Sequence, residues 1–257
     1  MHTTSNLRLS FDRFFAATER HRWELETDIP WAEVRPDLVT QDEVRVLRGS
    51  ALVESFAPGY GADLLTTFAA DVAMSSFLTI QLYEEFKHFH ALRRYLHCLG
   101  IEVTDAEITQ GRAERVAYDD PLVPLLKFGI SEVFTAVAYR EIARHTREPV
   151  LQKLSTCISD DEYRHLGWYV SYLEGYVNEH GIGAAEVNAA LEHYQHQGLD
   201  AIGSEWVEHW NFVGERYTRL EPYRYLKRML RGLVGSGVKL QNMGRRTSNF
   251  TGAQTFR

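Results

Sequence analysis

The sequence contains two copies of a short motif whose residue types can bind a metal ion. Glu85 and His88 form Glu-x-x-His within YEEFKHFHAL, and Glu162 and His165 repeat the pattern within SDDEYRHLGW. Residues three apart lie on one face of an α-helix, so each copy can aim a carboxylate and an imidazole at one ion. A single copy arises easily by chance, as a solvated helix face with an incidental histidine. Two copies in one chain favour a metal site.

Each motif has an upstream glutamate at nearly the same distance. Glu54 precedes Glu85 by 31 residues (85 − 54), and Glu132 precedes Glu162 by 30 (162 − 132). At about 1.5 Å per residue, a helix, a turn and a returning helix bring such positions to the same height. Glu54 and Glu132 both interrupt apolar stretches, and a buried carboxylate is costly unless a cation lies opposite it. The spacing therefore predicts two helical hairpins, each with its own carboxylates.

These positions match the ligand pattern of di-iron carboxylate bundles. In such bundles two helices each supply a glutamate and two others each supply Glu-x-x-His. Hard carboxylates with two imidazoles suit iron, with manganese as the alternative, better than copper or a structural zinc ion. Six ligands shared by two ions leave coordination positions for water or dioxygen. The predicted metal ligands are Glu54, Glu85, His88, Glu132, Glu162 and His165.

Two further acidic residues directly precede the motif glutamates. Because metal-bound histidines usually donate their other ring N–H to a carboxylate, we expect Asp161 to orient His88 and Glu84 to orient His165. The alternative is that both carboxylates face solvent. Arg164 either pairs with a carboxylate near the site or lies on the surface.

Two other residues lie one turn beyond a predicted ligand. The Thr135 hydroxyl, after Glu132, can reach the open side of the metals or bond its own i−4 carbonyl, the commoner fate of a helical threonine. Trp168, after His165, fits electron transfer or a place in the core, and we favour the core.

The elements that position these residues are predicted to be helices. Long stretches have 3.6-residue apolar periodicity without the alternation of strands, which predicts an all-α chain. Residues 23–38 are expected to form a wrapping arm, 111–121 a crossover and 244–257 a loose tail. Pro58 and Gly59 are expected to break the helix that carries Glu54. The helices are expected at 7–21, 41–54, 64–99, near 105, 122–145, 150–180, 184–197, 204–216 and 222–233.

Composition narrows the class of protein. The chain has 257 residues, of which 44% are apolar, and a net charge of −7, which argues against a nucleic-acid partner. We expect no membrane span, because no apolar run approaches about 18 residues; the nearest, 68–80, is interrupted by polar residues. The N-terminus lacks the layout of a signal peptide. Cys98 and Cys157 have no paired spacing, which favours reduced thiols and a cytoplasmic location.

Residues 41–176 resemble the soluble acyl-carrier-protein desaturase branch of the ferritin-like di-iron family. ALVESFAPGYGADLL is similar to that family's first ligand helix, YEEFKHFHALRRYL to its Glu-Glu-x-x-His segment, ISEVFT to its third ligand helix and SDDEYRH to its Asp-Glu-x-Arg-His signature. The resemblance implies a ferritin-like four-helix bundle over about 41–180, with an N-terminal helix and a C-terminal extension over about 184–240, in a single domain spanning 1–257. It implies the same six ligands, and Thr135 matches the threonine associated with dioxygen activation.

The sequence departs from that family at several places. Leu166 follows His165 where a second acidic residue is usual, and no distinctive carrier-binding sequence is present. RWELETDIPW resembles arylamine N-oxygenases more weakly, because their additional histidine ligand would fall at Ile158. The ribonucleotide reductase small subunit keeps a radical tyrosine where this chain has Leu92, which counts against radical storage.

The leading hypothesis is an O2-dependent non-haem di-iron oxidase. It would resemble an acyl-carrier-protein desaturase and act on an acyl thioester or another small organic substrate, which a carrier protein could hold. Two iron ions, dioxygen and an external electron donor such as ferredoxin are implied, and a homodimer is the family's usual state. The alternatives are a di-iron N-oxygenase or hydroxylase, a non-enzymatic ferritin-like iron-binding protein, and a helical bundle without metal. Five apolar residues fit a substrate slot or an ordinary core: Leu82, Phe86, Phe89, Phe128 and Phe134.

Overall fold

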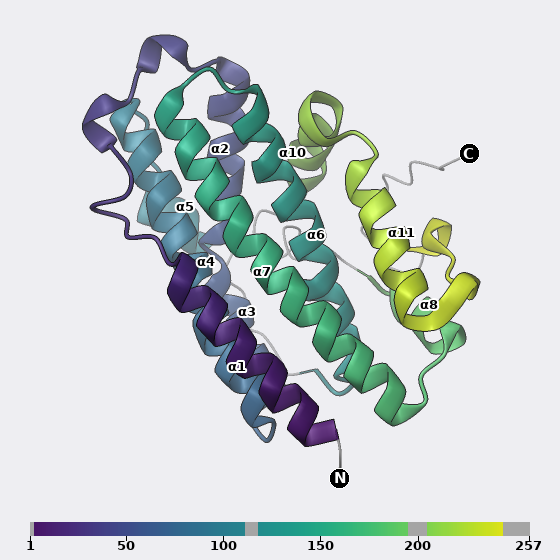
Figure 1. Cartoon of the computed structure of the whole chain (residues 1–257). Helices are drawn as coiled ribbons and strands as arrows, with labels where there is room; N and C mark the ends of the chain where they lie inside the picture. Colours follow the sequence, from purple (N-terminus) through teal and green to yellow (C-terminus); the bar gives the residue numbers. More distant parts are fainter. Residues whose placement is uncertain (1–2, 111–117, 195–204, 244–257) are drawn as a thin grey trace.

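The described chain is entirely helical. The computed structural model describes residues 3–110, 118–194 and 205–243, and no strand occurs among them (Figure 1). The predicted all-α class is therefore confirmed. The α-helices are α1 (Thr3–His21), α2 (Gln41–Glu54), α3 (Ala57–Thr67), α4 (Val72–Cys98), α5 (Asp105–Gln110), α6 (Leu122–His145), α7 (Pro149–His180), α8 (Ala184–Glu192), α10 (Glu205–Val213) and α11 (Glu221–Val234).

Three of the four ligand-bearing helices, α2, α4 and α7, begin at side-chain caps. Thr40 Oγ1 accepts the N–H of Glu43 at 3.2 Å, and the Glu43 carboxylate accepts the N–H of Thr40 at 2.7 Å, which completes a capping box. Asp71 caps α4 and Glu148 caps α7 in the same way, each accepting a backbone N–H three residues on. Each cap satisfies an otherwise unpaired amide and fixes where the helix starts.

One predicted boundary was wrong. The expected helix over 64–99 is two elements, because Asp71 has an extended backbone and starts α4 at Val72. Residues 64–67 instead belong to α3, which begins at Ala57 and has Pro58 in its first turn. A proline fits the first turn of a helix, where its missing N–H would have no partner anyway, so Pro58 starts a helix here rather than bending α2.

The other predicted helices differ from the structure mainly at their ends. The helix predicted over 122–145 matches α6, and the one over 150–180 matches α7 to within a residue. In α7 the last turn is closed by Gly181, which has a positive φ of 63°. The arm between α1 and α2 contains two short 3₁₀ turns, Trp31–Glu33 and Pro36–Leu38. The crossover at 111–117, residues 195–204 of the tail helices and the tail at 244–257 lie outside the described residues.

The long helices pack in pairs. α2 lies against α4, α6 lies against α7, and α4 also contacts α7, while α1 runs along α4 and α7 (Figure 1). α8, α10 and α11 lie on the side of α6 that faces away from α4. The described chain is thus a helical bundle with additional helices on its outside.

Two buried apolar clusters enclose a polar layer. Along α4, Met74 to Leu78 belong to one cluster and Phe89 to Leu96 to the other, and α6 and α7 divide in the same way. Between the clusters lie the residues of both Glu-x-x-His motifs. The sequence order of apolar and polar residues therefore places a charged layer at mid-height of the bundle.

α6 is long and strongly apolar. Among the described helices it is the one whose length and composition would allow it to cross a membrane. Residues 68–80 were expected to come nearest to a membrane span. α6 comes nearer, because the mean hydropathy of its apolar run stays high although a few charged residues interrupt it. Of its apolar window, 78% is buried inside the molecule, as in the core helix of a bundle.

Candidate metal centre

All six predicted ligands meet in the polar layer. Glu54 ends α2, Glu132 lies in α6, and the two Glu-x-x-His motifs lie in α4 and α7. None of the six side chains is more than 5% exposed. The i, i+3 spacing in α4 and α7 turns both members of each motif into the bundle, as the sequence indicated.

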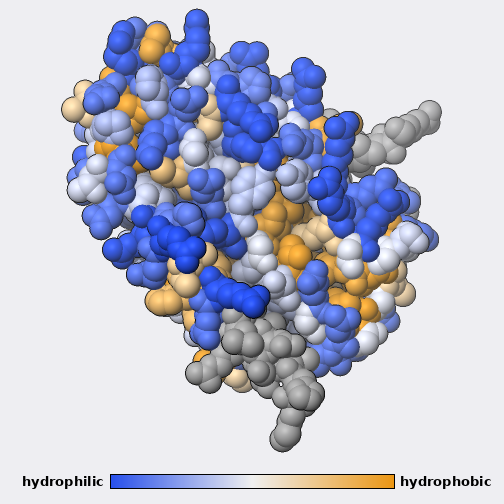
Figure 2. Space-filling model, viewed as in Figure 1, coloured by the Kyte–Doolittle hydropathy of each residue, from blue (hydrophilic) through white to orange (hydrophobic). Residues whose placement is uncertain are grey.

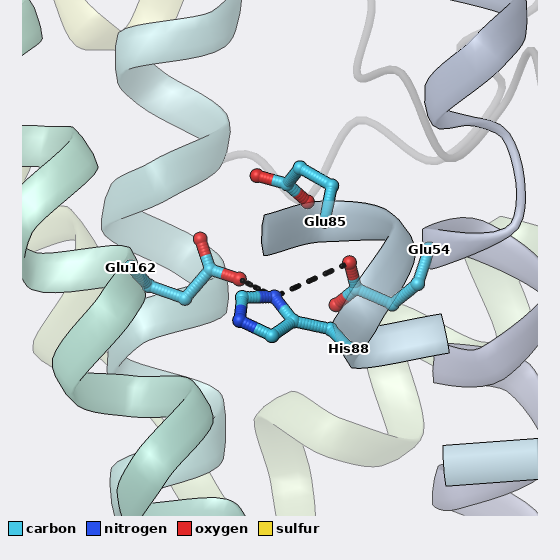
Figure 3. A group of neighbouring side chains, drawn as sticks. All are labelled: Glu54, Glu85, His88 and Glu162. Carbon is cyan, nitrogen blue, oxygen red and sulfur yellow. Dashed lines mark ion pairs between the residues drawn. The ribbon is translucent and has the colours of Figure 1, made fainter. Parts of the chain in front are cut away.

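The six residues form two adjacent groups that can each hold a metal ion. The ligand atoms of each group lie within 4.8 Å of one another. Glu85 and Glu162 belong to both groups, so their carboxylates stand between the two positions. Figure 3 shows the first group, in which the His88 ring lies between Glu162 and Glu54. The groups are Glu54, Glu85, His88 and Glu162, and Glu85, Glu132, Glu162 and His165.

The inward nitrogens of both histidines face carboxylates. His88 Nδ1 lies 3.2 Å from Glu162 Oε1 and 4.0 Å from Glu54 Oε2. His165 Nδ1 lies 3.4 Å from Glu85 Oε1, and 3.5 Å from the nearest oxygens of Glu132 and Glu162. These separations suit atoms that share a cation between them.

Four buried atoms at this centre have no hydrogen-bond partner of proper geometry: His88 Nδ1, Glu132 Oε2, Glu162 Oε1 and His165 Nδ1. Leaving one buried polar atom unsatisfied costs about 1–3 kcal/mol, so four together call for a ligand. All four are donor atoms that iron or manganese accepts. The residues present therefore fit a pair of metal ions.

The outer nitrogens of the histidines make the two hydrogen bonds that the sequence predicted. His88 Nε2 donates to Asp161 Oδ2 at 3.0 Å, and His165 Nε2 donates to Glu84 Oε2 at 2.8 Å. Because a carboxylate only accepts, these bonds place the ring proton on Nε2 and leave the Nδ1 lone pair directed at the centre. Both acidic residues are buried, so the solvent-facing alternative is wrong for each.

Two cations balance Asp161 and Glu84. Arg164 contacts both carboxylates, as one of its predicted alternatives required, and Lys87 Nζ lies 3.3 Å from Asp161 Oδ2. Trp23, from the arm before α2, donates its indole N–H to the same Asp161 oxygen at 2.8 Å and lies under the Lys87 ammonium. The arm is thereby tied to the outer side of His88.

Three residues that the sequence did not reveal hold the ligand carboxylates. The Tyr139 hydroxyl donates to Glu54 Oε1 at 2.6 Å. Gln81 Nε2 donates to Glu132 Oε1 at 2.7 Å, and the Tyr169 hydroxyl donates to Gln81 Oε1 at 2.9 Å. Gln81 lies one turn before Glu85 on the same helix face, a spacing that could have indicated it.

Burial and crowding shift the acidity of the ligands. Burial, together with the charges of neighbouring glutamates, raises the pKa of Glu54 and of Glu132 well above its usual range. Burial acts in the same direction on Glu162, but the two histidines beside it outweigh burial and lower its pKa. Burial lowers the pKa of His88, but the neighbouring carboxylates of Asp161 and Glu162 outweigh it and, with no metal bound, raise the value to about 10. The layer therefore favours positive charge among its carboxylates.

The Thr135 hydroxyl is bonded within its own helix. It donates to the carbonyl of Ser131 at 3.1 Å, the alternative noted from the sequence. Trp168 is 2% exposed and packs against Phe77 and Phe14, in line with a core position. A catalytic role of Thr135 remains a prediction.

The apolar residues expected to line a substrate slot pack as core. Phe128 and Phe134 belong to one buried cluster and Phe89 to the other, with Leu82 and Phe86 packed against them. The described surface has a small pocket of about 100 Å³ between α6 and α8 and a groove of about 360 Å³ beside α4. None of these five residues lines either one.

No protein-family model and no curated protein matches this chain.

Proposed function

We propose that this chain is a ferritin-like di-iron protein that oxidises an organic substrate with dioxygen. The observation that carries the proposal is the set of four unsatisfied buried donor atoms, which belong to two ligand groups bridged by Glu85 and Glu162. The packing of α2 on α4 and of α6 on α7 fits a four-helix di-iron bundle, in which each pair supplies a glutamate and a Glu-x-x-His motif.

The chain's own residues have distinct tasks at such a centre. Glu54 and His88 would hold one ion and Glu132 and His165 the other, with the two remaining glutamates between them. A pair of reduced iron ions held by these residues would supply the electrons and the site for dioxygen that oxidases and oxygenases of this type require.

The residues around the ligands orient them and exclude water. Asp161 and Glu84 fix the histidine rings, and Gln81 fixes one oxygen of Glu132. Tyr139 holds a proton at its hydroxyl, 2.6 Å from Glu54 Oε1. The two apolar clusters on either side of the layer keep bulk water away, which strengthens every electrostatic interaction inside it.

The substrate class is proposed from the resemblance to acyl-carrier-protein desaturases. An acyl thioester is therefore the first candidate, and amines, whose oxidation would make the protein an N-oxygenase, are the second. A cytoplasmic homodimer that receives electrons from a protein such as ferredoxin is part of the same proposal.

Metal analysis tests the centre directly. The purified chain, loaded anaerobically with ferrous iron and desalted, should retain about two iron ions per chain. Glu85→Ala should lose most of that iron, because Glu85 belongs to both ligand groups. Glu174→Ala, an exposed position on α7, is the matched control and should retain it. Equal iron in Glu85→Ala and the wild type would remove the basis of the proposal.

Product analysis tests the reaction. The reduced, iron-loaded protein is exposed to dioxygen with acyl thioesters, amines and free fatty acids, and the products are weighed by mass spectrometry. Loss of two hydrogens indicates desaturation, and gain of one oxygen indicates hydroxylation or N-oxygenation. Iron uptake without any substrate oxidation, together with a large spherical assembly on size-exclusion chromatography, would instead support iron storage.

A further inference from the structure

The charge of the chain is divided sharply along its length. Residues 222–257 contain eight Lys and Arg and no Asp or Glu, whereas residues 1–221 contain the other 20 basic residues and all 35 acidic ones. The C-terminal part thus carries +8 in a protein whose net charge is −7. Such asymmetry is typical of a segment that binds an anionic partner.

Half of these positive charges lie on one face of α11. Arg224, Lys227, Arg228 and Arg231 have i, i+3, i+4 and i+7 spacing, which places them in a single stripe along the helix. All four are exposed. We call these four residues the basic stripe. Figure 2 shows hydrophilic residues along α11 beside an exposed apolar area between α11 and α7.

The basic stripe is not neutralised by the described part of the protein. None of its four side chains makes an ion pair with a described residue, and the one acidic residue of α11, Glu221, pairs with Arg140 of α6 at 2.6 Å. Like charges three and four apart on a helix repel one another. The fold thus carries a repulsion that an external anionic surface would relieve.

The cations of the groove beside α4 differ from those of the basic stripe. In the groove, Arg93 pairs with Asp105 at 2.9 Å and Arg94 pairs with Glu26 at 2.5 Å. Those charges already have internal partners, whereas the charges of the basic stripe do not.

The shape of the surface favours a small acidic protein over a membrane. Leu226 and Leu230 of α11 are fully buried in the core. The half-buried apolar residues of the helix pack against the same cluster, so its apolar face is already covered for the most part by the protein and offers little to insert into lipid; they are Tyr223, Met229, Leu233 and Val234. The stripe is about 10 Å long, and the rest of the chain is acidic, so an extended anionic surface would also meet repulsion. A small protein can contact the stripe alone. Leu220, 52% exposed and one turn before Arg224, adds an apolar contact at its end.

The stripe's helix is in contact with the helix that carries Glu132. The Tyr223 ring meets the Phe134 ring edge-on at 5.3 Å, and Phe134 follows Glu132 by two residues. Trp210 of α10 meets the other side of this contact, with its ring 4.7 Å from Phe134. Aromatic contacts therefore join α11 to the helix that carries Glu132, so a partner docked on α11 would lie one helix away from a predicted metal ligand.

We propose that the basic stripe of α11 docks a small acidic protein and that this partner is the electron donor of the metal centre. The assignment as electron donor rests on the proposed function, whereas the docking of an acidic protein does not.

A binding experiment tests the docking, with an acidic plant-type [2Fe–2S] ferredoxin as the probe. Isothermal titration against the full chain should show binding whose Kd rises at least about tenfold between about 20 mM and about 200 mM NaCl. Lys227→Glu/Arg231→Glu should weaken binding at low salt at least about tenfold. Arg147→Glu/Lys153→Glu changes exposed residues of α7 and the turn before it, reaches the same net charge of −11 (−7 less 4), and should bind like the wild type.

Three outcomes overturn the docking proposal: no binding by the wild type, binding that survives in the stripe variant, or equal loss in both variants. Vesicles rich in phosphatidylserine and a DNA duplex are titrated in parallel. If either binds the stripe more tightly than the ferredoxin does, the partner is not an acidic protein.

The assignment of the partner as electron donor is tested by the rate at which reduced ferredoxin reduces the iron-loaded protein. At sub-saturating ferredoxin this rate should fall in Lys227→Glu/Arg231→Glu and stay unchanged in Arg147→Glu/Lys153→Glu. An unchanged rate despite lost binding overturns the electron-donor assignment. Failure of the chain to hold iron refutes the proposed function separately, because the binding titrations require no metal.

Discussion

At the scale of single residues, Asp161 is the point where the metal centre is connected to the rest of the protein. Its Oδ2 atom accepts hydrogen bonds from His88 Nε2 and Trp23 Nε1, and it lies beside the side chains of Lys87 and Arg164. Burial acts to raise the pKa of Asp161, but the bond from His88 and the two cations outweigh it and hold the carboxyl ionised. The residue thus sets both the tautomer and the orientation of a metal ligand.

Asp161→Asn should therefore weaken metal binding without removing a ligand. The amide keeps the shape but loses the charge that favours the His88 Nε2–H tautomer, and such changes typically cost about 10–100-fold in metal affinity. Competition with a chromogenic chelator measures the affinity. Asp160→Asn makes the same chemical change at the neighbouring exposed position and should leave the affinity unaltered. Equal affinities in the two variants would show that Asp161 does not orient His88.

The site residues that could be predicted from the sequence differ from those that could not in the sequence separation of their contacts. The ligand pairs and the neighbours Asp161 and Glu84 follow from helical spacing, which is local and can be counted along the chain. Trp23 contacts Asp161 across 138 residues, and Tyr139 contacts Glu54 across 85. Only the packing of the arm and of the helices brings these atoms together, so spacing alone could not predict them.

At the scale of elements, local chemistry decided which boundaries were predictable. α6 and α7 follow uninterrupted apolar periodicity and were predicted almost to the residue. The division between α3 and α4 was missed, because an apolar run continues through the break and only the cap at Asp71 marks it. The effect of Pro58 was hard to predict for a related reason. A proline can break a helix, but it also fits the first turn of a new one, and here it lies in the first turn of α3.

The contact of α10 with α2 depends on a glycine and a histidine. A Cβ atom on Gly49 would lie 2.3 Å from His209 Nδ1, so only glycine lets the imidazole lie against α2. Burial, with a smaller contribution from the charge of Arg45, lowers the pKa of His209 to about 4. The contact therefore requires the neutral ring.

This contact should weaken in mild acid. The folded pKa of His209 lies below its unfolded value, so the unfolded chain takes up a proton first as the pH falls. The stability contributed by the neutral ring is present above about pH 6.5 and is lost as the pH falls toward 4, by on the order of 1–2 kcal/mol, given partial exposure. Urea unfolding at pH 7 and pH 5 measures the loss.

His209→Gln supplies the control for this pH effect. Carboxylates elsewhere also titrate in this range, but they do so equally in both proteins. The variant should therefore lose less stability between pH 7 and pH 5 than the wild type. An identical loss in the two proteins would show that His209 does not titrate with folding.

At the scale of the whole molecule, the bundle places four carboxylates in a layer closed by apolar residues on both sides. The predicted class and the ligand set follow from sequence pattern, because a six-residue constellation fixes which helix faces must converge. The position of α8, α10 and α11 outside α6 does not follow, since amphipathic helices can cover any apolar face. Their arrangement places α11, with its basic stripe, against the helix that carries Glu132.

The same layer makes the stability of the protein depend on its metal. Burying four carboxylates side by side is costly, since each opposes the ionisation of the others, and a bound cation removes that cost; the four belong to Glu54, Glu85, Glu132 and Glu162. Metal that binds only the folded chain stabilises it by about 2.7 kcal/mol at a free concentration about 100-fold above Kd. For a chain of this size that corresponds to a rise in Tm of roughly 5–10 °C.

Calorimetry of the chelator-treated protein before and after ferrous iron is added anaerobically measures this rise. Glu85→Ala should show no rise, because it lacks one of the two carboxylates common to both groups. Its metal-free form should unfold at a higher temperature than the metal-free wild type, because one of the four crowded, buried carboxylates is gone. The two effects have opposite signs, so a general loss of packing, which lowers Tm with and without metal alike, cannot imitate them. A metal-free Glu85→Ala protein that unfolds below the metal-free wild type would show that packing around Glu85, and not the crowding of buried carboxylates, dominates the stability of the layer.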